Sequence, residues 1–347
     1  MINRRAVLVG CGGISGGWLK AVPRVPGLSV VGFVDLDAAK AKARAEAFGG
    51  REAFVGTRLE EAIEKTRPDV VLDCTVPEAR WPVAEIALSA GCHVFSEKPL
   101  ADSMENARRI CAAARAAGRT HAVMQNRRCL VPIARFRRWI ESDALGRLAQ
   151  LDADFILGAH FGGFRDRMRH VLLLDMAIHH FDMARFLIGA DAKWAWCREW
   201  NPPGSWYDHD AAALAAFGMA DGTVFSYRGS WCGEGLNTSW QARWRAQGER
   251  GAAEWDGEDG LRGEIVAKTR GFKSELAPLA PPDDFDAWRK DGHAGMIERF
   301  FRCLDEGREP ETVCHENIKS LAMVFAAIRS AAEDRRVSLD EILVAGA

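Results

Sequence analysis

A glycine-rich loop between an apolar strand and a helix constrains the fold of this chain more than any other feature. Residues 5–9 (RAVLV) are predicted to form a buried strand, and the loop from Gly10 to Ser15 (GCGGIS) follows directly. A second apolar run ends at Asp35, at about the 20-residue spacing at which dinucleotide-binding loops of the pattern G-x-G-x-x-G/A have an acidic residue. Serine stands at the third small position and is nearly as small as glycine. A plain structural turn is the alternative, but the strand, the helix and Asp35 favour nucleotide binding.

Apolar strands and helices alternate over the first third of the chain. Further strands are predicted at 28–35, 69–75, 93–99 and 121–126, with helices at 37–47, 57–66, 79–90 and 102–117. The pairs Thr57–Glu60 and Asp102–Glu105 are expected to cap two of these helices. Strands this apolar, separated by helices, are typical of a parallel sheet covered on both faces. We therefore predict an α/β fold whose residues 1–125 form a doubly wound Rossmann domain.

From residue 126 onward the pattern changes to that of an α+β domain. Helices are predicted at 132–141 and 174–188, with a strand at 151–157 between them. Period-two runs follow from 193 to about 266, separated by turn pairs such as Asp221-Gly222, and they predict a large, open, mostly antiparallel sheet. Two more helices are expected near 295–305 and 315–334. Residues 126–347 are therefore predicted to form a second domain.

Charge, apolar runs and cysteines exclude several classes of protein. The 46 basic and 48 acidic residues give a formal net charge of −2, which is too little positive charge for a general grip on nucleic acid. No apolar run approaches the roughly 20 residues of a membrane-spanning helix, so no membrane partner is expected. The nine cysteines are scattered without a CxxC pair, which predicts free thiols, a reducing, cytoplasmic location and no zinc site.

Asp35 also bears on the choice of cofactor. A carboxylate at the adenosine ribose repels the 2′-phosphate of NADP, Asp37 adds to this repulsion, and the next basic residue along the chain is Lys40. The sequence therefore favours NAD over NADP.

Polar residues at two further places are candidates for chemistry. Lys98, in Glu97-Lys98-Pro99, lies at the carboxyl end of a predicted strand, where open parallel sheets bind ligands, although a solvated lysine beside a turn is the alternative. Asp175 and His179 are four residues apart, so on a helix they project from one face, and the carboxylate can orient the imidazole for proton transfer. A core histidine satisfied by an aspartate is the competing interpretation. A metal site would draw on His160, His170, His179, His180 and Asp175, but their spacing fits no standard ligand pattern, so no metal is expected.

Taken together and in this order, these motifs resemble those of one family. The loop Gly10–Ser15, Asp35, Glu97-Lys98-Pro99 and Asp175-x-x-x-His179 are similar to those of the glucose–fructose oxidoreductase / inositol dehydrogenase / rhizopine-catabolism (Gfo/Idh/MocA) family, over nearly the whole chain. The resemblance implies an N-terminal Rossmann domain, a C-terminal domain for substrate binding and oligomerisation, and a closing helix at 315–334 that packs back on the Rossmann domain. It also implies hydride exchange between a nicotinamide and a sugar, sugar acid or cyclic polyol.

The resemblance assigns roles to individual residues. Lys98, Asp175 and His179 are expected to be catalytic, and Pro99 to follow a cis peptide bond. The expected cofactor contacts are Gly10, Gly12, Gly13, Ile14, Ser15, Asp35, Thr75, Pro77, Glu97 and Lys98. The expected substrate contacts are Lys98, Asn126, Arg128, Arg169, Asp175, His179 and Trp206. Ala177 and Trp81 depart from many relatives, which have glycine and histidine there, and Trp81 is expected to narrow the cleft. A non-catalytic NAD-binding metabolite sensor and an NAD-dependent glycosidase remain alternatives.

Tryptophans and arginines in the second half suggest further contacts. Trp194, Trp196 and Trp200, and then Trp231, Trp240 and Trp244, have even spacings, which predicts that each cluster lies on one face of a strand. An apolar sheet face packed on another subunit, giving a homodimer or homotetramer, is favoured over stacking on sugars. The arginines of 165–169 either cover an acidic substrate or form a solvated basic loop.

Overall fold

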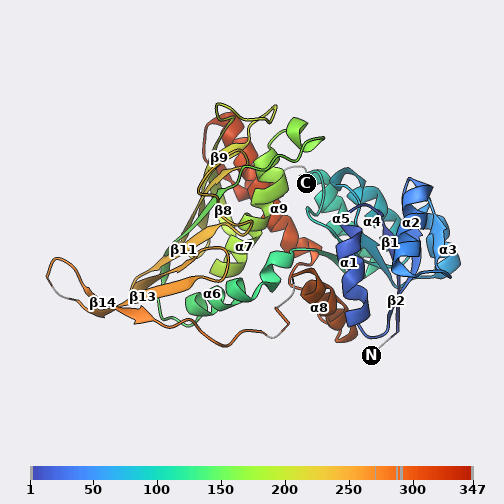
Figure 1. Ribbon diagram of the computed structural model, residues 1–347, viewed down its shortest axis with the longest axis horizontal. Helices are drawn as coiled ribbons and strands as arrows, with labels where there is room; N and C mark the ends of the chain where they lie inside the picture. The colour runs from blue at the N-terminus through green and yellow to red at the C-terminus, as the bar shows by residue number, and fades with distance from the viewer. Residues whose placement is uncertain (1–2, 270, 287, 290–291, 345–347) are drawn as a thin grey trace. The chain divides into compact units, whose positions relative to one another are not determined.

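The computed structural model describes residues 3–269, 271–286, 288–289 and 292–344, and the chain forms two compact units (Figure 1). The first unit comprises Met1–Cys129 and Trp288–Ile318, and the second comprises Leu130–Ala287 and Lys319–Ala347. The predicted boundary after residue 125 falls close to the first of these changes. The return of 288–318 to the first unit was not expected from the sequence. The functional division of the chain into a nucleotide domain and a substrate domain stays a prediction.

The first unit is built on a parallel sheet with the strand order β3-β2-β1-β4-β5-β6 over the described residues. Its strands are β1 (Arg4–Val9), β2 (Leu28–Val34), β3 (Phe54–Gly56), β4 (Val70–Asp73), β5 (His93–Ser96) and β6 (His121–Val123). Its helices are α1 (Ser15–Ala21), α2 (Ala38–Phe48), α3 (Leu59–Thr66), α4 (Arg80–Ser89), α5 (Met104–Ala117) and α8 (His293–Asp305). The order reverses between β1 and β4, the point where such sheets bind ligands. The predicted doubly wound fold is confirmed.

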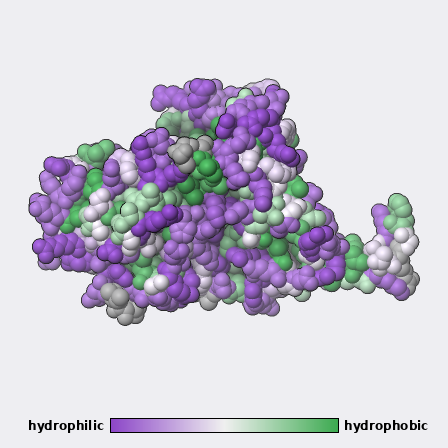
Figure 2. All heavy atoms as spheres, turned by 180° about the vertical axis from the view of Figure 1, so that it is seen from behind, coloured by the Kyte–Doolittle hydropathy of each residue, from purple (hydrophilic) through white to green (hydrophobic). Residues whose placement is uncertain are grey.

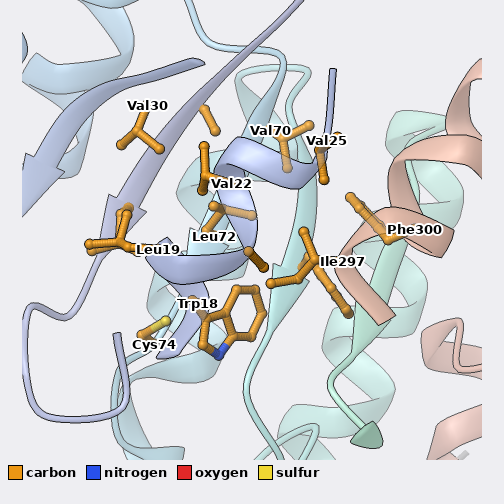
Figure 3. Close-up of a cluster of buried hydrophobic side chains, with 14 of the residues drawn as sticks. Trp18, Leu19, Val22, Val25, Val30, Val70, Leu72, Cys74, Ile297 and Phe300 are labelled. Carbon is orange, nitrogen blue, oxygen red and sulfur yellow. The ribbon is translucent and has the colours of Figure 1, made fainter. Parts of the chain in front are cut away.

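Helix α8 completes the hydrophobic core on one side of this sheet. Figure 3 shows Trp18 of α1, Val22 in the turn that follows it, and Ile297 and Phe300 of α8 in one cluster with apolar residues of the strands. The rings of Phe95 on β5 and Phe300 are stacked with their centroids 4.5 Å apart. A segment near the end of the chain therefore closes the core of a unit that begins at the N-terminus.

The two predicted helix caps are wrong in detail. Helix α3 has Arg58 at its N-cap with no side-chain cap, so Thr57 does not cap it. Helix α5 is capped by Ser103, whose Oγ accepts a hydrogen bond from the backbone N–H of Asn106. Asp102 lies one residue too early and instead accepts a hydrogen bond from Asn106 Nδ2, at 2.8 Å.

The second unit contains a sheet with the order β14-β13-β12-β11-β7-β10-β9-β8-β15, as far as the described residues extend. Its strands are β7 (Leu148–Ile156), β8 (Ala192–Trp200), β9 (Ala212–Met219), β10 (Val224–Ser230), β11 (Arg243–Gly248), β12 (Gly251–Trp255), β13 (Leu261–Lys268), β14 (Glu275–Leu279) and β15 (Val337–Ser338). Strands β7 and β10 pair in parallel and the other pairs are antiparallel. The predicted mostly antiparallel sheet is confirmed.

Helices cover one face of this sheet. They are α6 (Val131–Glu141), α7 (Ile178–Ile188) and α10 (Leu339–Leu343), with α9 (Cys314–Glu333) carrying the chain from the first unit into the second. Phe181 of α7 meets the ring of Phe217 edge-on, with 4.7 Å between centroids, and Phe225 stacks on Trp244 in the next layer. The prediction that the closing helix packs back on the Rossmann domain stays a prediction.

The tryptophans do not all lie where the spacing predicted. Trp196 and Trp200 are 37% and 38% exposed on the open face of β8. By contrast, Trp231 and Trp244 are buried, and Trp240 lies in a turn before β11. The prediction from even spacing was wrong for Trp231, Trp240 and Trp244 because these residues do not share one strand. Strand β10 ends at Ser230, and β11 begins only at Arg243.

Among the described helices, none is long and apolar enough to cross a membrane. Figure 2 shows that hydrophilic side chains cover most of the face in view, and that hydrophobic ones form separate smaller patches.

Candidate active site

The glycine loop after β1 has the geometry that a bound dinucleotide requires. Gly10 has a φ of +85°, and a Cβ there would lie 2.7 Å from the carbonyl carbon of Cys74, so only glycine fits. A Cβ at Gly12 or Gly13 would meet nothing within 4 Å, which leaves the space that a pyrophosphate occupies in this motif. Ser15 is fully buried and its Oγ donates to the carbonyl of Gly12, at 2.6 Å. The loop therefore fits a dinucleotide.

The carboxylate of Asp35 lies against this loop. It accepts hydrogen bonds from the backbone N–H of Cys11 (2.7 Å) and of Asp37 (2.9 Å). A further contact, not expected from the sequence, comes from Arg44 of α2, whose Nη2 donates to the carbonyl of Gly12 at 2.8 Å. Its position three residues after the buried Ala41, on the helix face toward the sheet, was the available signal. An anionic and a cationic side chain thus contact the same loop.

The segment Glu97-Lys98-Pro99 is fixed through Glu97. The Lys98–Pro99 peptide bond is cis, as expected. The Glu97 carboxylate is buried, accepts a hydrogen bond from Trp18 Nε1 (2.7 Å) and lies 3.5 Å from His293 Nε2. Burial alone would raise its pKa, but the hydrogen bonds from His293 and Trp18 outweigh burial and hold the pKa of Glu97 below its usual value. The ionised side chain of Glu97, the residue before Lys98, therefore connects this segment to α1 through Trp18 and to α8 through His293.

A buried ion pair that the sequence analysis missed supports the same edge of the sheet. Arg80 Nη1 lies 2.9 Å from Asp73 Oδ1, and both side chains are almost completely buried. Asp73 also accepts hydrogen bonds from the backbone N–H and the hydroxyl of Thr75. Arg80 Nε donates to the carbonyl of Pro99, at 3.3 Å. Thr75, Pro77 in the next turn and the cis peptide are therefore held around one arginine.

Two predicted substrate contacts of the first unit already have protein partners. Asn126 Nδ2 is 3.2 Å from Nδ1 of His293, the residue that also contacts Glu97. Arg128 is buried, with Nη1 4.0 Å from the carboxylate of Glu311. Trp81 lies beside Arg109 of α5, 5.9 Å from the guanidinium carbon to the ring centroid. Their roles toward a substrate stay predictions.

In the second unit, Asp175 and His179 lie on one continuous helical segment. Its first turns form a π-helix, Leu172–Ala177, and α7 follows directly, whereas the sequence predicted an α-helix throughout. Such wide turns are frequent at functional sites. Asp175 is largely buried, His179 is 8% exposed, and Gly189 ends the helix as predicted.

Arg165 is directed at Asp175. Its Nε donates to Asp175 Oδ2 at 2.9 Å, and its guanidinium carbon lies 4.8 Å from the ring centroids of both Phe161 and Phe164. Arg167 and Arg169 are exposed. The arginine segment is therefore not uniform, because one member is fixed on the proposed catalytic carboxylate.

The histidines of this unit take separate partners. His170 Nδ1 is 2.7 Å from Glu199, and this hydrogen bond outweighs burial and raises the pKa of His170. His160 contacts Glu234 and stacks on Trp206, with 3.6 Å between centroids, while Trp206 Nε1 donates to the carbonyl of Ala159. His180 is fully buried with Nδ1 3.3 Å from the Tyr227 hydroxyl, so it is a core histidine. Among the described residues, no three His, Cys, Asp or Glu side chains form a group that could hold a metal.

Comparison with known proteins identifies the family. Residues 4–125 match the model for the oxidoreductase family with an NAD-binding Rossmann fold, and residues 133–254 match the GFO/IDH/MocA C-terminal domain. The uncharacterized protein y4oX of Sinorhizobium fredii is 30% identical over 91% of this chain and 89% of its own length. The D-apiose dehydrogenase of Paraburkholderia graminis is 26% identical over 97% of this chain and 90% of its own length.

A solved structure shows the same fold. An oxidoreductase from Agrobacterium radiobacter, in complex with NAD+, L-tartaric acid and magnesium, superposes with a TM-score of 0.85 at 20% identity, covering 98% of this chain and 100% of that one. The chain therefore belongs to the Gfo/Idh/MocA family of oxidoreductases, with an NAD(P)-binding Rossmann domain and the C-terminal domain of that family.

Proposed function

We propose that the protein is a dehydrogenase that transfers hydride between a nicotinamide cofactor and a CH–OH or carbonyl carbon of a sugar, sugar acid or cyclic polyol. The observation that carries this proposal is the dinucleotide loop, with Gly10 required by the turn and Asp35 beside it. The relatives support the substrate class, since they include a D-apiose dehydrogenase and an inositol 2-dehydrogenase of Rhizobium meliloti.

The cofactor would be held at the switch point of the parallel sheet. The proposed contacts are Gly10, Gly12, Gly13, Ile14, Ser15, Asp35, Thr75, Pro77, Glu97 and Lys98. When bound, the nicotinamide supplies the hydride acceptor. We propose NAD rather than NADP because the Asp35 carboxylate would repel a 2′-phosphate, although Arg44 of α2, which contacts the same loop, acts in the opposite direction.

The chain's own residues would move the proton and stabilise charge. His179 accepts the proton of the reacting hydroxyl while hydride leaves the carbon that bears this hydroxyl. Lys98 donates a hydrogen bond to the hydroxyl oxygen as that oxygen gains negative charge. Asp175 orients the imidazole or the hydroxyl, and Arg165 holds that carboxylate in place. The proposed substrate contacts are Lys98, Asn126, Arg128, Arg169, Asp175, His179 and Trp206.

The test is the absorbance of NADH after the protein is mixed with NAD+ and a panel of polyols, sugars and sugar acids. Net NADH with one class of compound supports the dehydrogenase. Cleavage of a glycoside without net NADH would instead indicate an NAD-dependent glycosidase. Tight NAD+ binding with neither reaction would indicate a metabolite sensor.

Replacing Asp35 with alanine is expected to weaken NAD+ binding by about 10–100-fold. A charge-assisted hydrogen bond to the ribose is worth roughly 1.5–3 kcal/mol, and each 1.4 kcal/mol is about a factor of ten. The same change should strengthen NADP+ binding, because Arg44 then faces the 2′-phosphate without an opposing carboxylate. Titration of both cofactors by calorimetry measures the two effects.

Two variants control this experiment. The Asp37→Ala variant changes a carboxylate that accepts a hydrogen bond from the backbone N–H of Ala39 at the start of α2, and it should alter the Kd of NAD+ by less than about threefold. The double variant Asp35→Ala/Arg44→Ala should lose the gain toward NADP+. Unchanged NAD+ binding in the Asp35→Ala variant would contradict the assignment of Asp35 to the ribose.

The open face of the second sheet is the proposed surface for association into a homodimer or homotetramer. Trp196, Trp200 and Leu214 are exposed on β8 and β9. Beyond them lies a charged area, where Glu254 on β12 pairs with both Arg245 and Arg262. Aromatic residues and arginine are enriched at subunit interfaces, and the rim of an interface is polar.

The Trp196→Glu variant is expected to weaken self-association by at least about 30-fold, because a central aromatic residue at an interface is commonly worth 2 kcal/mol or more. Light scattering over a concentration series measures this. Trp240→Glu is the matched control, since Trp240 is 46% exposed but lies outside the strands. A monomeric wild-type protein would overturn the interface.

A further inference from the structure

The fold brings together two thiols outside the nucleotide loop. Cys111 lies on α5, and Cys314 is the first residue of α9, so the two are far apart in the sequence but belong to the same unit. The side chains of Cys111 and Cys314 are hydrogen-bonded to each other. Both residues line a surface cavity of about 390 Å³, which Arg115 and His315 also line. The two thiols are therefore neighbours on the wall of a space that a small molecule can enter.

The two cysteines differ in their electrostatic surroundings. The hydrogen bond from Cys111 is the main cause of a lowered pKa at Cys314, with further help from the backbone N–H groups of Cys314 and His315, which outweigh burial. Donating that hydrogen bond raises the pKa of Cys111. A thiolate at the start of a helix is a typical reactive cysteine. Cys314 is thus the better nucleophile, and Cys111 is its hydrogen-bonded neighbour.

The remaining cysteines lack this combination. Burial raises the pKa of six thiols, which keeps them protonated and unreactive: those of Cys11, Cys74, Cys92, Cys129, Cys197 and Cys303. Cys232 is half-buried, and its sulfur lies 3.6 Å from the hydroxyl of Ser230. In the described part of the chain, no third ligand-type side chain joins Cys111 and Cys314 to make a metal group. A reaction between the two sulfurs is therefore the chemistry that the pair favours.

We propose that Cys111 and Cys314 form a peroxide-reactive dithiol that closes into an intramolecular disulfide. The Cys314 thiolate attacks one oxygen of hydrogen peroxide, the O–O bond breaks, and hydroxide leaves, taking up a proton to become water. The Cys111 sulfur then attacks the sulfur of the Cys314 sulfenic acid, forms the S–S bond and releases a second water. Peroxide is reduced by two electrons, and the two thiols are oxidised by the same two.

The disulfide would join α5 to the first turn of α9, the helix that carries the chain from the first unit into the second. In a reducing compartment the pair rests as thiols, and small-molecule thiols reverse the bridge after the oxidant is gone. This modification does not depend on the proposed hydride transfer.

The experiment treats the reduced full-length protein with a few equivalents of hydrogen peroxide, blocks free thiols with iodoacetamide and analyses tryptic peptides by mass spectrometry. Cleavage after arginine and lysine places Cys111 in peptide 110–115 and Cys314 in peptide 309–319, each with a single cysteine. The expected result is that most of both peptides appear as one linked species, which dithiothreitol separates again. Iodoacetamide alone at neutral pH is expected to modify Cys314 about tenfold faster than Cys232.

Variants assign the roles of the two sulfurs. Cys111→Ser should abolish the linked peptide and leave Cys314 as a sulfenic acid that dimedone traps. Cys314→Ser should abolish both products, whereas Cys232→Ser should leave the yield of linked peptide unchanged. The proposal is overturned if wild-type protein gives no linked peptide while Cys232 is oxidised as fast as Cys314, or if the linked mass survives in Cys111→Ser.

Discussion

Replacing His179 with glutamine is expected to lower kcat by roughly 10²–10⁴-fold, the usual contribution of a positioned general base. Glutamine keeps the size and polarity of the side chain but cannot take up the hydroxyl proton. Substrate KM should change little, because the lost interaction belongs to the transition state. Steady-state kinetics on the substrate found with the NADH panel measures both constants.

His170 provides the matched control for this variant. It lies just before the helical segment that contains His179, but its imidazole is bound to Glu199. His170→Gln should therefore keep kcat within about threefold of wild type, because His170 is not proposed to transfer a proton to or from the substrate. If His179→Gln and Lys98→Ala both retain near-normal turnover, the catalytic assignment is wrong.

Replacing Arg80 with alanine is expected to lower the free energy of unfolding by about 3–5 kcal/mol. The change leaves the Asp73 carboxylate buried without its cation, and it removes the hydrogen bond to the carbonyl of Pro99. The midpoint of urea unfolding, combined with the slope of the transition, gives this free energy.

Two comparisons distinguish the effect of burying the Asp73–Arg80 ion pair from the effect of its charges on stability. Arg109→Ala breaks an exposed pair with Glu105 on α5 and should cost no more than about 1 kcal/mol. The double variant Asp73→Leu/Arg80→Met removes both charges and should recover most of the stability, because no buried charge is then left alone. An equal loss of unfolding free energy in Arg80→Ala and Arg109→Ala would show that the buried ion pair stabilises the protein no more than an exposed one.

Local sequence patterns were sufficient to predict the architecture. Runs such as residues 28–35 are apolar because both faces of a parallel sheet are covered, so they identify strands without any long-range information. The glycine loop and Asp35 are likewise encoded over a short stretch. Strand β3 was not predicted because its residues, Phe54–Gly56, do not form part of a longer apolar run. The π-helix at Leu172–Ala177 was not predicted either, because an apolar run does not distinguish an α-helical turn from a wider one.

Side-chain partners that no regular spacing connects could not be predicted from local patterns. Arg80 and Arg165 each look like an ordinary surface arginine in the sequence, and only the fold reveals Asp73 and Asp175 as their partners. The two thiols in contact were hidden for the same reason, since no CxxC spacing links Cys111 to Cys314. The spacing of residues along the sequence does not show which segments lie side by side in the tertiary fold.

The return of α8 to the first unit affects how the protein is made. The first 129 residues leave the ribosome without the helix whose Ile297 and Phe300 cover Trp18 and Phe95. Bacterial and eukaryotic ribosomes add roughly 5–20 residues per second, so synthesis of the intervening segment takes on the order of ten to thirty seconds. During that interval the aromatic side chains that α8 later covers are exposed on the nascent nucleotide-binding unit. Chaperones that recognise exposed apolar side chains can bind this surface until α8 has been synthesised.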